Sequence, residues 1–307
     1  MICKSVAIND TASIETYFLN NSREYNTNKK RPLILVIPGG GYAFTSDREA
    51  EPIALKFNSI GCHAAILWYT VYDQVPNVPK NGLIECMKAI AWLRAHADEY
   101  CIDPNLICVC GFSAGGNLAL QAALRWQQDW LNDETGTQPA DRKVNLCIDC
   151  YGALRFPISR PGDLGFGALL CEKPQSSNMR FFGVENPTLQ DVEQNNPLTH
   201  FDAACCPPMF IWHNGQDELV PVTDALDLAG VLAKAKVPFE LVIFERGEHG
   251  LALADRTTAR KDSHKDAHTA TWFAQCEAWL ANYIDTTDEP YGQYPKGLPD
   301  RKGPSNL

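Results

Sequence analysis

Leu106-Ile-Cys-Val-Cys-Gly-Phe-Ser-Ala-Gly-Gly116 sets the fold class of this chain. Its first five residues, Leu106–Cys110, have the composition of a buried strand, and Gly111-Phe-Ser113-Ala-Gly115 matches the pattern G-x-S-x-G. A helical pattern that ends near Trp130 follows at once. A sharp strand-to-helix turn needs glycine where a side chain would clash, and it places the serine hydroxyl at a helix N-terminus, which favours an anion. The stretch predicts that Ser113 is a nucleophile; the alternative is an ordinary glycine-rich turn.

Short β-rich runs alternate with longer helical patterns along the rest of the chain. This alternation is typical of an α/β protein with a mostly parallel central sheet and helices on both faces. The predicted strands cover residues 16–19 (as an early edge strand), 31–38, 63–69, 106–110, 144–151, 209–213 and 239–244. The predicted helices cover residues 48–59, 83–100, 223–236 and 271–284, besides the one after Ser113. Asp103-Pro104 is expected to break the chain before the strand that leads to Ser113.

Two segments interrupt this alternation. Residues 153–206 are too long for a plain connection between strands, so we expect a small cap or lid insertion near the site. Residues 286–307 are rich in proline, glycine and charge, which predicts an extended tail or an interface arm. We therefore expect one domain over residues 1–285, followed by a C-terminal tail that could reach a second copy in a homo-oligomer.

The composition excludes several classes of partner. The 307 residues carry 27 Lys and Arg against 37 Asp and Glu, a formal charge of −10, with no basic cluster. Neither a nucleic acid nor an anionic membrane surface is therefore expected as a partner. The N-terminus has no secretory signal pattern, and the apolar runs are shorter than a membrane span. With twelve scattered cysteines, these features favour a reducing, cytoplasmic location.

The pair Cys147 and Cys150 has the spacing of a redox or metal-binding motif. Both residues lie in a predicted strand, where positions three apart point to opposite faces. We therefore interpret these two thiols as small apolar core groups.

Pro38-Gly39-Gly40-Gly41-Tyr42 follows the predicted strand at residues 31–38. Three glycines in a row leave backbone N–H groups that a ligand can approach closely. Next to a nucleophilic serine, the N–H groups of Gly40 and Gly41 would complete an oxyanion hole with that of Ala114. The alternatives are a flexible turn or a phosphate cradle; the run lacks the Lys-Ser/Thr ending of a P-loop.

A serine hydroxyl needs a general base, for which imidazole is suited near neutral pH. In this type of fold the order along the chain is Ser…Asp/Glu…His, which favours His249, between two glycines after the last predicted strand. His213 lies before the expected acid and is interpreted as structural. His264 and His268 could bind a metal if they shared a helix, but their charged neighbours indicate a solvated face, so no metal is expected.

The acid that orients the histidine should follow the strand before it. Asp217 lies in a loop just past the predicted strand at residues 209–213, which makes it the first candidate. Glu218 is adjacent, and Asp149 and Asp224 are further candidates, because a triad is set by geometry that a sequence only implies.

With these motifs in this order, the chain resembles the α/β-hydrolase superfamily over nearly all its length. It is most similar to the esterase branch related to hormone-sensitive lipase and to bacterial acetylxylan and feruloyl esterases. The similar segments are Asp103–Ala119, Asn196-Pro-Leu-Thr-His200, Pro207-Pro-Met-Phe-Ile-Trp-His213 and Asp217-Glu-Leu-Val-Pro-Val222. That branch usually has His-Gly-Gly-Gly before the oxyanion hole; here Pro38 replaces the histidine.

The resemblance implies a serine esterase that hydrolyses short acyl esters of small molecules, with acetyl groups on carbohydrates as one substrate class. It implies no cofactor. The alternatives are a serine peptidase of the same fold and a non-catalytic ligand-binding protein on the same scaffold. Four aromatic residues could line the substrate pocket or equally belong to the core, namely Tyr42, Phe166, Phe181 and Phe182.

Overall fold

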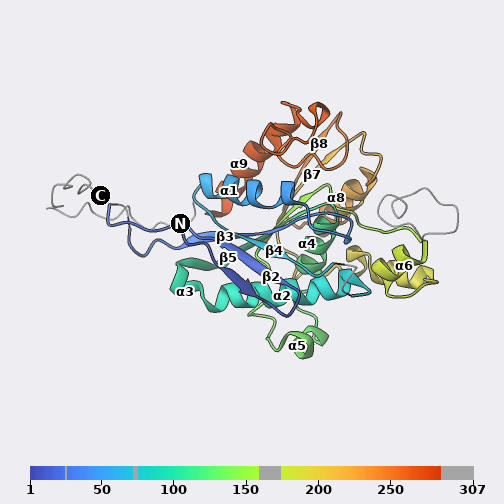
Figure 1. Cartoon of the computed structure of the whole chain (residues 1–307), viewed down its shortest axis with the longest axis horizontal. Coiled ribbons are helices and arrows are strands. Elements are labelled where there is room, and N and C mark those ends of the chain that lie inside the picture. The colour runs from blue at the N-terminus through green and yellow to red at the C-terminus, as the bar shows by residue number, and fades with distance from the viewer. Residues whose placement is uncertain (25, 72–74, 159–173, 285–307) are drawn as a thin grey trace.

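A computed structural model describes residues 1–24, 26–71, 75–158 and 174–284; the predicted tail at residues 286–307 lies outside this part. Within it, eight strands form one sheet in the order β1-β2-β4-β3-β5-β6-β7-β8 (Figure 1). The strands are β1 (Ser5–Ala7), β2 (Ser13–Tyr17), β3 (Arg31–Ile37), β4 (His63–Trp68), β5 (Ile102–Phe112), β6 (Leu146–Cys150), β7 (Met209–Asn214) and β8 (Phe239–Phe244). β1 pairs antiparallel with β2, and β2 with β4, while the other neighbours are parallel. The mostly parallel sheet is therefore confirmed.

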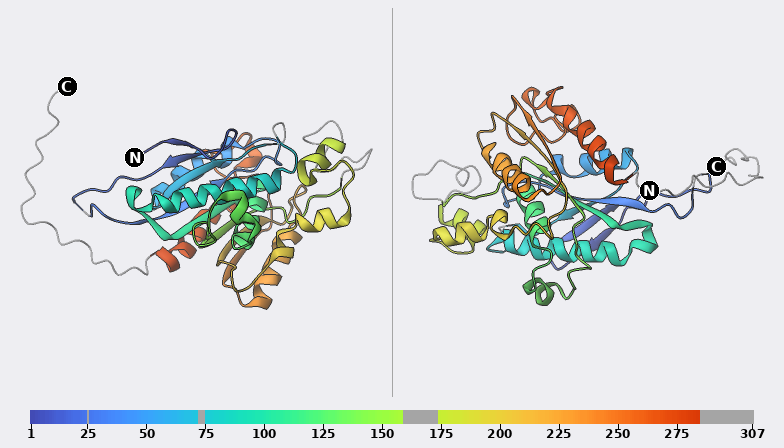
Figure 2. Two further views of the ribbon diagram at one scale, coloured as in Figure 1. Left: turned by 90° about the horizontal axis from the view of Figure 1, so that it is seen from below. Right: turned by 180° about the vertical axis from the view of Figure 1, so that it is seen from behind.

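The helices cover both faces of this sheet, as Figures 1 and 2 show. α1 and α9 lie on one face, and α2, α4 and α8 lie on the other. The α-helices are α1 (Glu51–Ser59), α2 (Val78–Ala95), α3 (Ala97–Tyr100), α4 (Ala114–Arg125), α5 (Trp130–Thr135), α6 (Pro174–Phe182), α7 (Leu189–Gln194), α8 (Thr223–Ala235) and α9 (Trp272–Ile284). Short 3-10 turns are η1 (Asp47–Glu49), η2 (Pro197–His200), η3 (Asp262–His264) and η4 (Thr269–Thr271).

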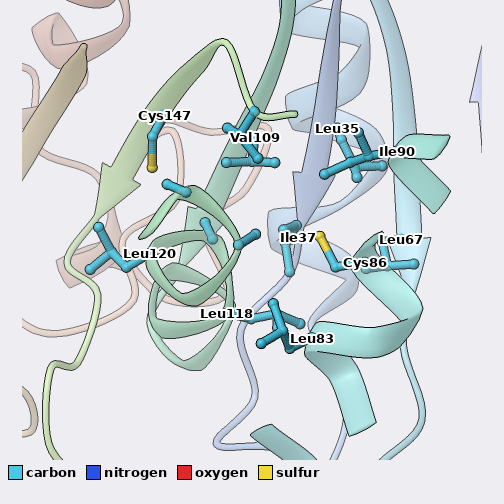
Figure 3. Close-up of a cluster of buried hydrophobic side chains, with 14 of the residues drawn as sticks. Leu35, Ile37, Leu67, Leu83, Cys86, Ile90, Val109, Leu118, Leu120 and Cys147 are labelled. Atoms are coloured by element: carbon cyan, nitrogen blue, oxygen red, sulfur yellow. The ribbon is translucent and has the colours of Figure 1, made fainter. Parts of the chain in front are cut away.

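Each central strand buries both of its faces. On β3, Leu35 and Ile37 pack toward α2 and α4, whereas Ile34 and Val36 pack toward α1 and α9. Figure 3 shows the first of these two clusters, in which side chains of β3, β4 and β5 meet those of α2 and α4. This two-sided burial explains why β3 and β5 read as continuous apolar runs.

Some predicted boundaries were wrong. β2 begins before residue 16, and it is not the edge of the sheet, because β1 covers it. The sequence did not reveal β1, which has only three residues and is mostly exposed. The predicted helix over residues 83–100 begins earlier, at Val78, where the Asn77 side chain accepts the N–H of Lys80, and it is divided at His96.

Asp103-Pro104 does not break the chain as predicted, because both residues lie within β5. β5 pairs with β6 only from Cys108 onward, so the missing N–H of Pro104 leaves no gap on that side. On the other side, the register with β3 shifts between Arg31 and Leu33. The irregular pairing accommodates the proline.

The described part of the insertion at residues 153–206 forms α6, α7 and η2. α6 contacts α2, and η2 contacts α4, so both lie on the same side of the sheet. Phe181 of α6 is buried and stacks on Phe156, with ring centroids 4.2 Å apart. The role of this insertion as a lid stays a prediction.

The two cysteines of the C-x-x-C pair face opposite sides of β6, as predicted. Cys147 belongs to the cluster beneath α2 and α4, and Cys150 to the cluster beneath α1 and α9. Burial raises the pKa of both thiols, which keeps them protonated core groups. In the described ranges, no helix combines the length and apolar character needed to cross a membrane.

Candidate active site

Ser113 sits on the turn between β5 and α4 in a conformation that few residues adopt. Its backbone has φ 56° and ψ −118°, and its N–H donates to the carbonyl of Cys150 at 3.0 Å. A Cβ at position 111 would lie 2.1 Å from the carbonyl oxygen of Gly115, and one at position 115 would lie 2.1 Å from that of Ile37. Both glycines of the motif are therefore required by close backbone packing, which confirms the predicted turn.

His249 connects the serine to an acid. Its Nε2 lies 2.7 Å from Ser113 Oγ, and its Nδ1 lies 2.6 Å from Asp217 Oδ2. Because a carboxylate only accepts, Nδ1 carries the proton that it donates to Asp217, and Nε2 is left to accept the Ser113 hydroxyl proton. The structure thus brings together the three residues predicted from the motif order.

Asp217 is held as an ionised acceptor, because loop amides donate to its Oδ1 and histidine side chains donate to its Oδ2. Oδ1 accepts the N–H groups of Leu219 and Val220, each at 2.9 Å. Burial alone would raise the pKa of Asp217, but hydrogen bonds from His213 and His249 outweigh it and hold this pKa well below its usual range. The carboxylate is charged and fixed before any substrate arrives.

The other candidate acids lie elsewhere. Glu218 is exposed to solvent. Asp224 accepts the N–H of Leu154 at 2.8 Å and pairs with Arg155. Asp149 is fully buried in β6, where burial raises its pKa to about 7, with Asp224 adding to the shift and His213 opposing it. Of the four carboxylates considered, Asp217 is the one that contacts His249.

Two backbone hydrogen bonds fix the peptide groups of the glycine loop after β3. The carbonyl of Gly39 accepts the N–H of Ser46 at 3.0 Å, and the carbonyl of Gly40 accepts that of Ala43 at 3.0 Å. A trans peptide points its N–H opposite to its carbonyl, so these two bonds orient the N–H groups of Gly40 and Gly41. Neither of these amides has an acceptor among the described residues. Ala114, at the first position of α4, has no intrahelical acceptor for its own N–H.

Side chains hydrogen-bond to both polar atoms of the Pro38–Gly39 peptide group, which precedes the amides of Gly40 and Gly41. The carbonyl of Pro38 accepts the hydroxyl of Tyr69 at 2.9 Å, and the N–H of Gly39 donates to the Glu49 carboxylate at 2.9 Å. Replacement of the family's usual histidine by Pro38 therefore leaves the loop anchored, and the amides of Gly40 and Gly41 stay available.

Four further residues that contact the triad or its loops were not predicted as part of the site. His213 was interpreted as structural, yet its Nε2 donates to the Val220 carbonyl at 2.9 Å and lies 3.3 Å from Asp217 Oδ2. Asn214 donates to the carbonyl of Glu248 at 3.2 Å and so supports the loop that carries His249. The other two are Glu49, which accepts the N–H of Gly39, and Tyr151, whose ring packs against that of His249. The phrase Trp212-His-Asn next to the acid was the one local signal for His213 and Asn214.

A polar hollow of about 1180 Å³ opens beside His249 and the loop of Asp217. Its remaining lining residues are mostly polar or charged: Gly215, Gln216, Glu218, Leu219, Gly247, Glu248, Ser263, Lys265 and Asp266. Three of the four aromatic pocket candidates are instead packed into the protein, since Tyr42, Phe181 and Phe182 are buried. Phe166 lies outside the described residues.

His264 and His268 do not share a helix. His264 ends η3 and lies 3.8 Å from Glu248, whereas His268 precedes η4 and packs its ring against Phe244. Among the described residues, no group of three or more His, Cys, Asp or Glu side chains is placed to hold a metal ion.

Two curated relatives are bacterial enzymes. The chain is 30% identical to endo-1,4-beta-xylanase B of Butyrivibrio fibrisolvens over 237 residues, which are 75% of this chain and 34% of the relative. It is 29% identical over 207 residues to "Probable carboxylic ester hydrolase LipM" of Mycobacterium tuberculosis, covering 63% of this chain and 43% of that protein. The chain thus spans less than half the length of either relative.

Solved structures of similar length share the fold. The acetyl ester-xyloside bifunctional hydrolase of Caldicellulosiruptor lactoaceticus superimposes with a TM-score of 0.70 at 29% identity, covering 91% of this chain and 96% of that chain. Together with the sheet order and the turn at Ser113, this similarity confirms the predicted α/β-hydrolase fold.

A protein-family model described as BD-FAE matches residues 7–232. The match includes Ser113, Asp217 and the glycine loop, and it ends before His249. Because it covers well over half of the sequence, the chain belongs to the BD-FAE family.

Proposed function

We propose that the chain is a serine carboxylesterase in which Ser113, His249 and Asp217 form the catalytic triad. The observation that carries the proposal is the continuous hydrogen-bonded line from Ser113 Oγ through the His249 ring to Asp217, with contacts of 2.7 and 2.6 Å. Such a line, on a strained strand-to-helix turn beside unpaired backbone amides, suits acyl transfer through a serine.

In the first half of the reaction, Ser113 Oγ attacks the carbonyl carbon of the ester while its proton passes to His249 Nε2. Asp217 keeps the ring in this tautomer and stabilises the imidazolium. The N–H groups of Gly40, Gly41 and Ala114 donate hydrogen bonds to the oxyanion that develops from the carbonyl oxygen. His249 then gives its proton to the leaving alcohol, and an acyl-serine remains.

Water completes the cycle. His249 takes a proton from a water molecule, which attacks the acyl-serine carbonyl, and the same amides stabilise the second oxyanion. The C–O bond to Ser113 breaks as His249 returns the proton to Oγ. A carboxylic acid leaves, and the starting enzyme is restored.

For the substrate, we propose a short acyl group, such as acetyl, on a polar alcohol of the carbohydrate class. The polar lining of the hollow beside His249 supports a hydroxyl-rich leaving group, because an apolar alcohol would leave those groups unsolvated. The names of two similar proteins, a xylanase and an acetyl ester-xyloside hydrolase, agree with this class.

The test is hydrolysis of p-nitrophenyl acetate, butyrate and octanoate by the native protein and by Ser113→Ala. We expect the highest kcat/KM for acetate, and we expect the variant to lose about 10³-fold or more of it, since it lacks the nucleophile. Activity that persists in the variant would contradict Ser113 as the nucleophile, whereas no turnover with any ester would contradict the esterase and favour a binding protein. Acetylated xylo-oligosaccharides and tributyrin then compare polar with apolar alcohols.

A further inference from the structure

A carboxylate is buried behind the nucleophile, outside the proposed triad. Glu49, the last residue of η1, is only 4% exposed. Its Oε2 accepts the N–H of Gly39 at 2.9 Å, and its Oε1 accepts the hydroxyl of Tyr151 at 2.8 Å. None of the ion pairs between described residues involves Glu49. A buried carboxyl group is costly unless it is hydrogen-bonded, so these two contacts hold it in place.

Tyr151 is the second member of this arrangement. It follows β6 with a left-handed backbone (φ 44°), and its side chain is fully buried. Its hydroxyl donates to Glu49 and accepts the N–H of Ala252 at 3.0 Å. Its ring packs edge-on against the His249 ring, with centroids 5.1 Å apart. Tyr151 thus contacts the histidine loop through both its ring and its hydroxyl.

The two side chains connect all three segments that form the site. Gly39 directly precedes the oxyanion amides of Gly40 and Gly41. Ala252 lies three residues after His249, and its carbonyl is held by Trp272 Nε1 at 2.9 Å. On the other side of Tyr151, the carbonyl of Cys150 receives the N–H of Ser113. One buried path therefore runs from the oxyanion loop through Glu49 and Tyr151 to the histidine loop.

We propose that Glu49 and Tyr151 are positioning residues that fix the oxyanion amides and His249 relative to one another around Ser113. This inference rests on the proposed esterase function. Its basis is that both Glu49 oxygens are engaged by Gly39 and Tyr151, so the carboxylate acts on the site through these two groups.

We expect substitution of either residue to weaken the stabilisation of the transition state and to leave substrate binding unchanged. Oxyanion donors stabilise charge only when they meet the oxygen of the tetrahedral intermediate at hydrogen-bond distance. A displacement of about 1 Å can cost up to 10²-fold in rate. Without the hydrogen bonds to Glu49 and Tyr151, Gly39 or Ala252 would shift. The oxyanion amides or the imidazole would then move by a fraction of that distance, while the substrate contacts would remain.

The central variants are Tyr151→Phe, which keeps the ring against His249 and removes the hydroxyl, and Glu49→Gln, which keeps the side-chain volume. With p-nitrophenyl acetate, we expect each to lower kcat about tenfold with KM within about twofold. The double variant should be little worse than either single one, because the two residues act as a unit. Glu49→Ala should lose more than Glu49→Gln, which can still accept the N–H of Gly39.

A matched pair elsewhere supplies the control. Tyr17 is also buried and donates to a glutamate, Glu51, at 3.4 Å, far from Ser113 along the chain. Tyr17→Phe also removes a tyrosine hydroxyl from a carboxylate, although Glu51 is exposed and its contact is longer than that of Glu49. We expect it to leave kcat and KM unchanged within about twofold, even if its effect on thermal unfolding equals that of Tyr151→Phe.

A short-chain trifluoromethyl ketone separates positioning from general destabilisation. Ser113 Oγ adds to its carbonyl carbon, the serine proton passes to His249, and the carbonyl oxygen becomes an oxyanion in the hole. We expect its affinity to fall in Tyr151→Phe and Glu49→Gln by the same factor as kcat/KM. Equal affinity in all variants, or kcat losses equal to those of Tyr17→Phe, would overturn the inference. Absence of hydrolysis by the native protein would instead contradict the esterase proposal itself.

Discussion

At the scale of single residues, the least expected contact is the one behind Asp217. Its Oδ2 is shared between His249, at 2.6 Å, and the fully buried His213, at 3.3 Å. Nε2 of His213 must carry a proton, since it faces two acceptors, the Val220 carbonyl and the Asp217 carboxylate. His213 thus gives Asp217 Oδ2 a second donor besides His249.

We predict that His213→Phe lowers kcat/KM about tenfold, because a hydrogen bond to a charged group is lost and Asp217 can turn away from His249. Steady-state hydrolysis of p-nitrophenyl acetate measures this effect. His63 is the matched control: it is fully buried too, and it accepts the N–H of Leu19 far from the site. His63→Phe should lower the unfolding temperature and leave kcat/KM unchanged. Equal kinetics in the two variants would refute a role for His213.

The sequence predicted the site residues that lie in a short motif or that follow from the order of the triad along the chain. Ser113 lies in a five-residue motif, and His249 and Asp217 follow from the order of the triad along the chain. Glu49 and Tyr151 carry no such signal. They are 102 residues apart and meet only because η1 and the end of β6 lie at the same end of the sheet.

At the scale of elements, the glycine loop depends on backbone conformations that only glycine adopts easily. Gly40 has φ 125°, and a Cβ there would lie 2.0 Å from the carbonyl oxygen of Phe44. The loop therefore cannot keep both its turn and a side chain at this position. The oxyanion role proposed for this loop depends on its backbone N–H groups and not on side chains.

We predict that Gly40→Ala lowers kcat at least 10²-fold, because the turn must open and at least one oxyanion donor moves away. Gly136→Ala provides the comparison. Gly136 also has a left-handed backbone (φ 69°), but no atom lies within 4 Å of an added Cβ. It should cost about 1 kcal/mol of unfolding free energy and no activity. If Gly40→Ala were as active as Gly136→Ala, the oxyanion assignment would be wrong.

Most elements were predicted, whereas their boundaries were less certain. Buried strands such as β3 can be recognised in the sequence as apolar runs. β1 is short and half-polar, and it is a strand only because it pairs with β2. Pro104 suggested a break, and the register shift beside it is a tertiary feature. Caps such as Asn77 decide where a helix begins, which periodicity alone does not reveal.

At the scale of the whole molecule, ionisation of Asp149 in the centre of the sheet opposes folding near neutral pH. Asp149 is fully buried, and among the described residues its Oδ1 has no hydrogen-bond partner. Burial raises its pKa to about 7, against about 4 in an unfolded chain. The folded protein thus binds this proton more tightly. The resulting contribution to stability is complete below about pH 4 and is lost as the pH rises toward 7.

We predict that Asp149→Asn stabilises the protein relative to native more at pH 8.5 than at pH 4.5, by about 2–4 kcal/mol, because the amide never ionises. Urea unfolding at the two pH values measures the difference. Asp98→Asn is the control, since the Asp98 side chain is 93% exposed. A stability difference for Asp149→Asn that is the same at both pH values would show that burial does not shift this carboxyl.

The central claim is that one serine, activated by one histidine, carries the acyl group. The most direct measurement is mass spectrometry of the native protein after reaction with a fluorophosphonate, with the modified peptide sequenced. One adduct on Ser113 is predicted, absent from Ser113→Ala and formed at least 10²-fold more slowly in His249→Ala. An adduct on another residue, or no adduct in a preparation that hydrolyses p-nitrophenyl acetate, would contradict the assignment of Ser113.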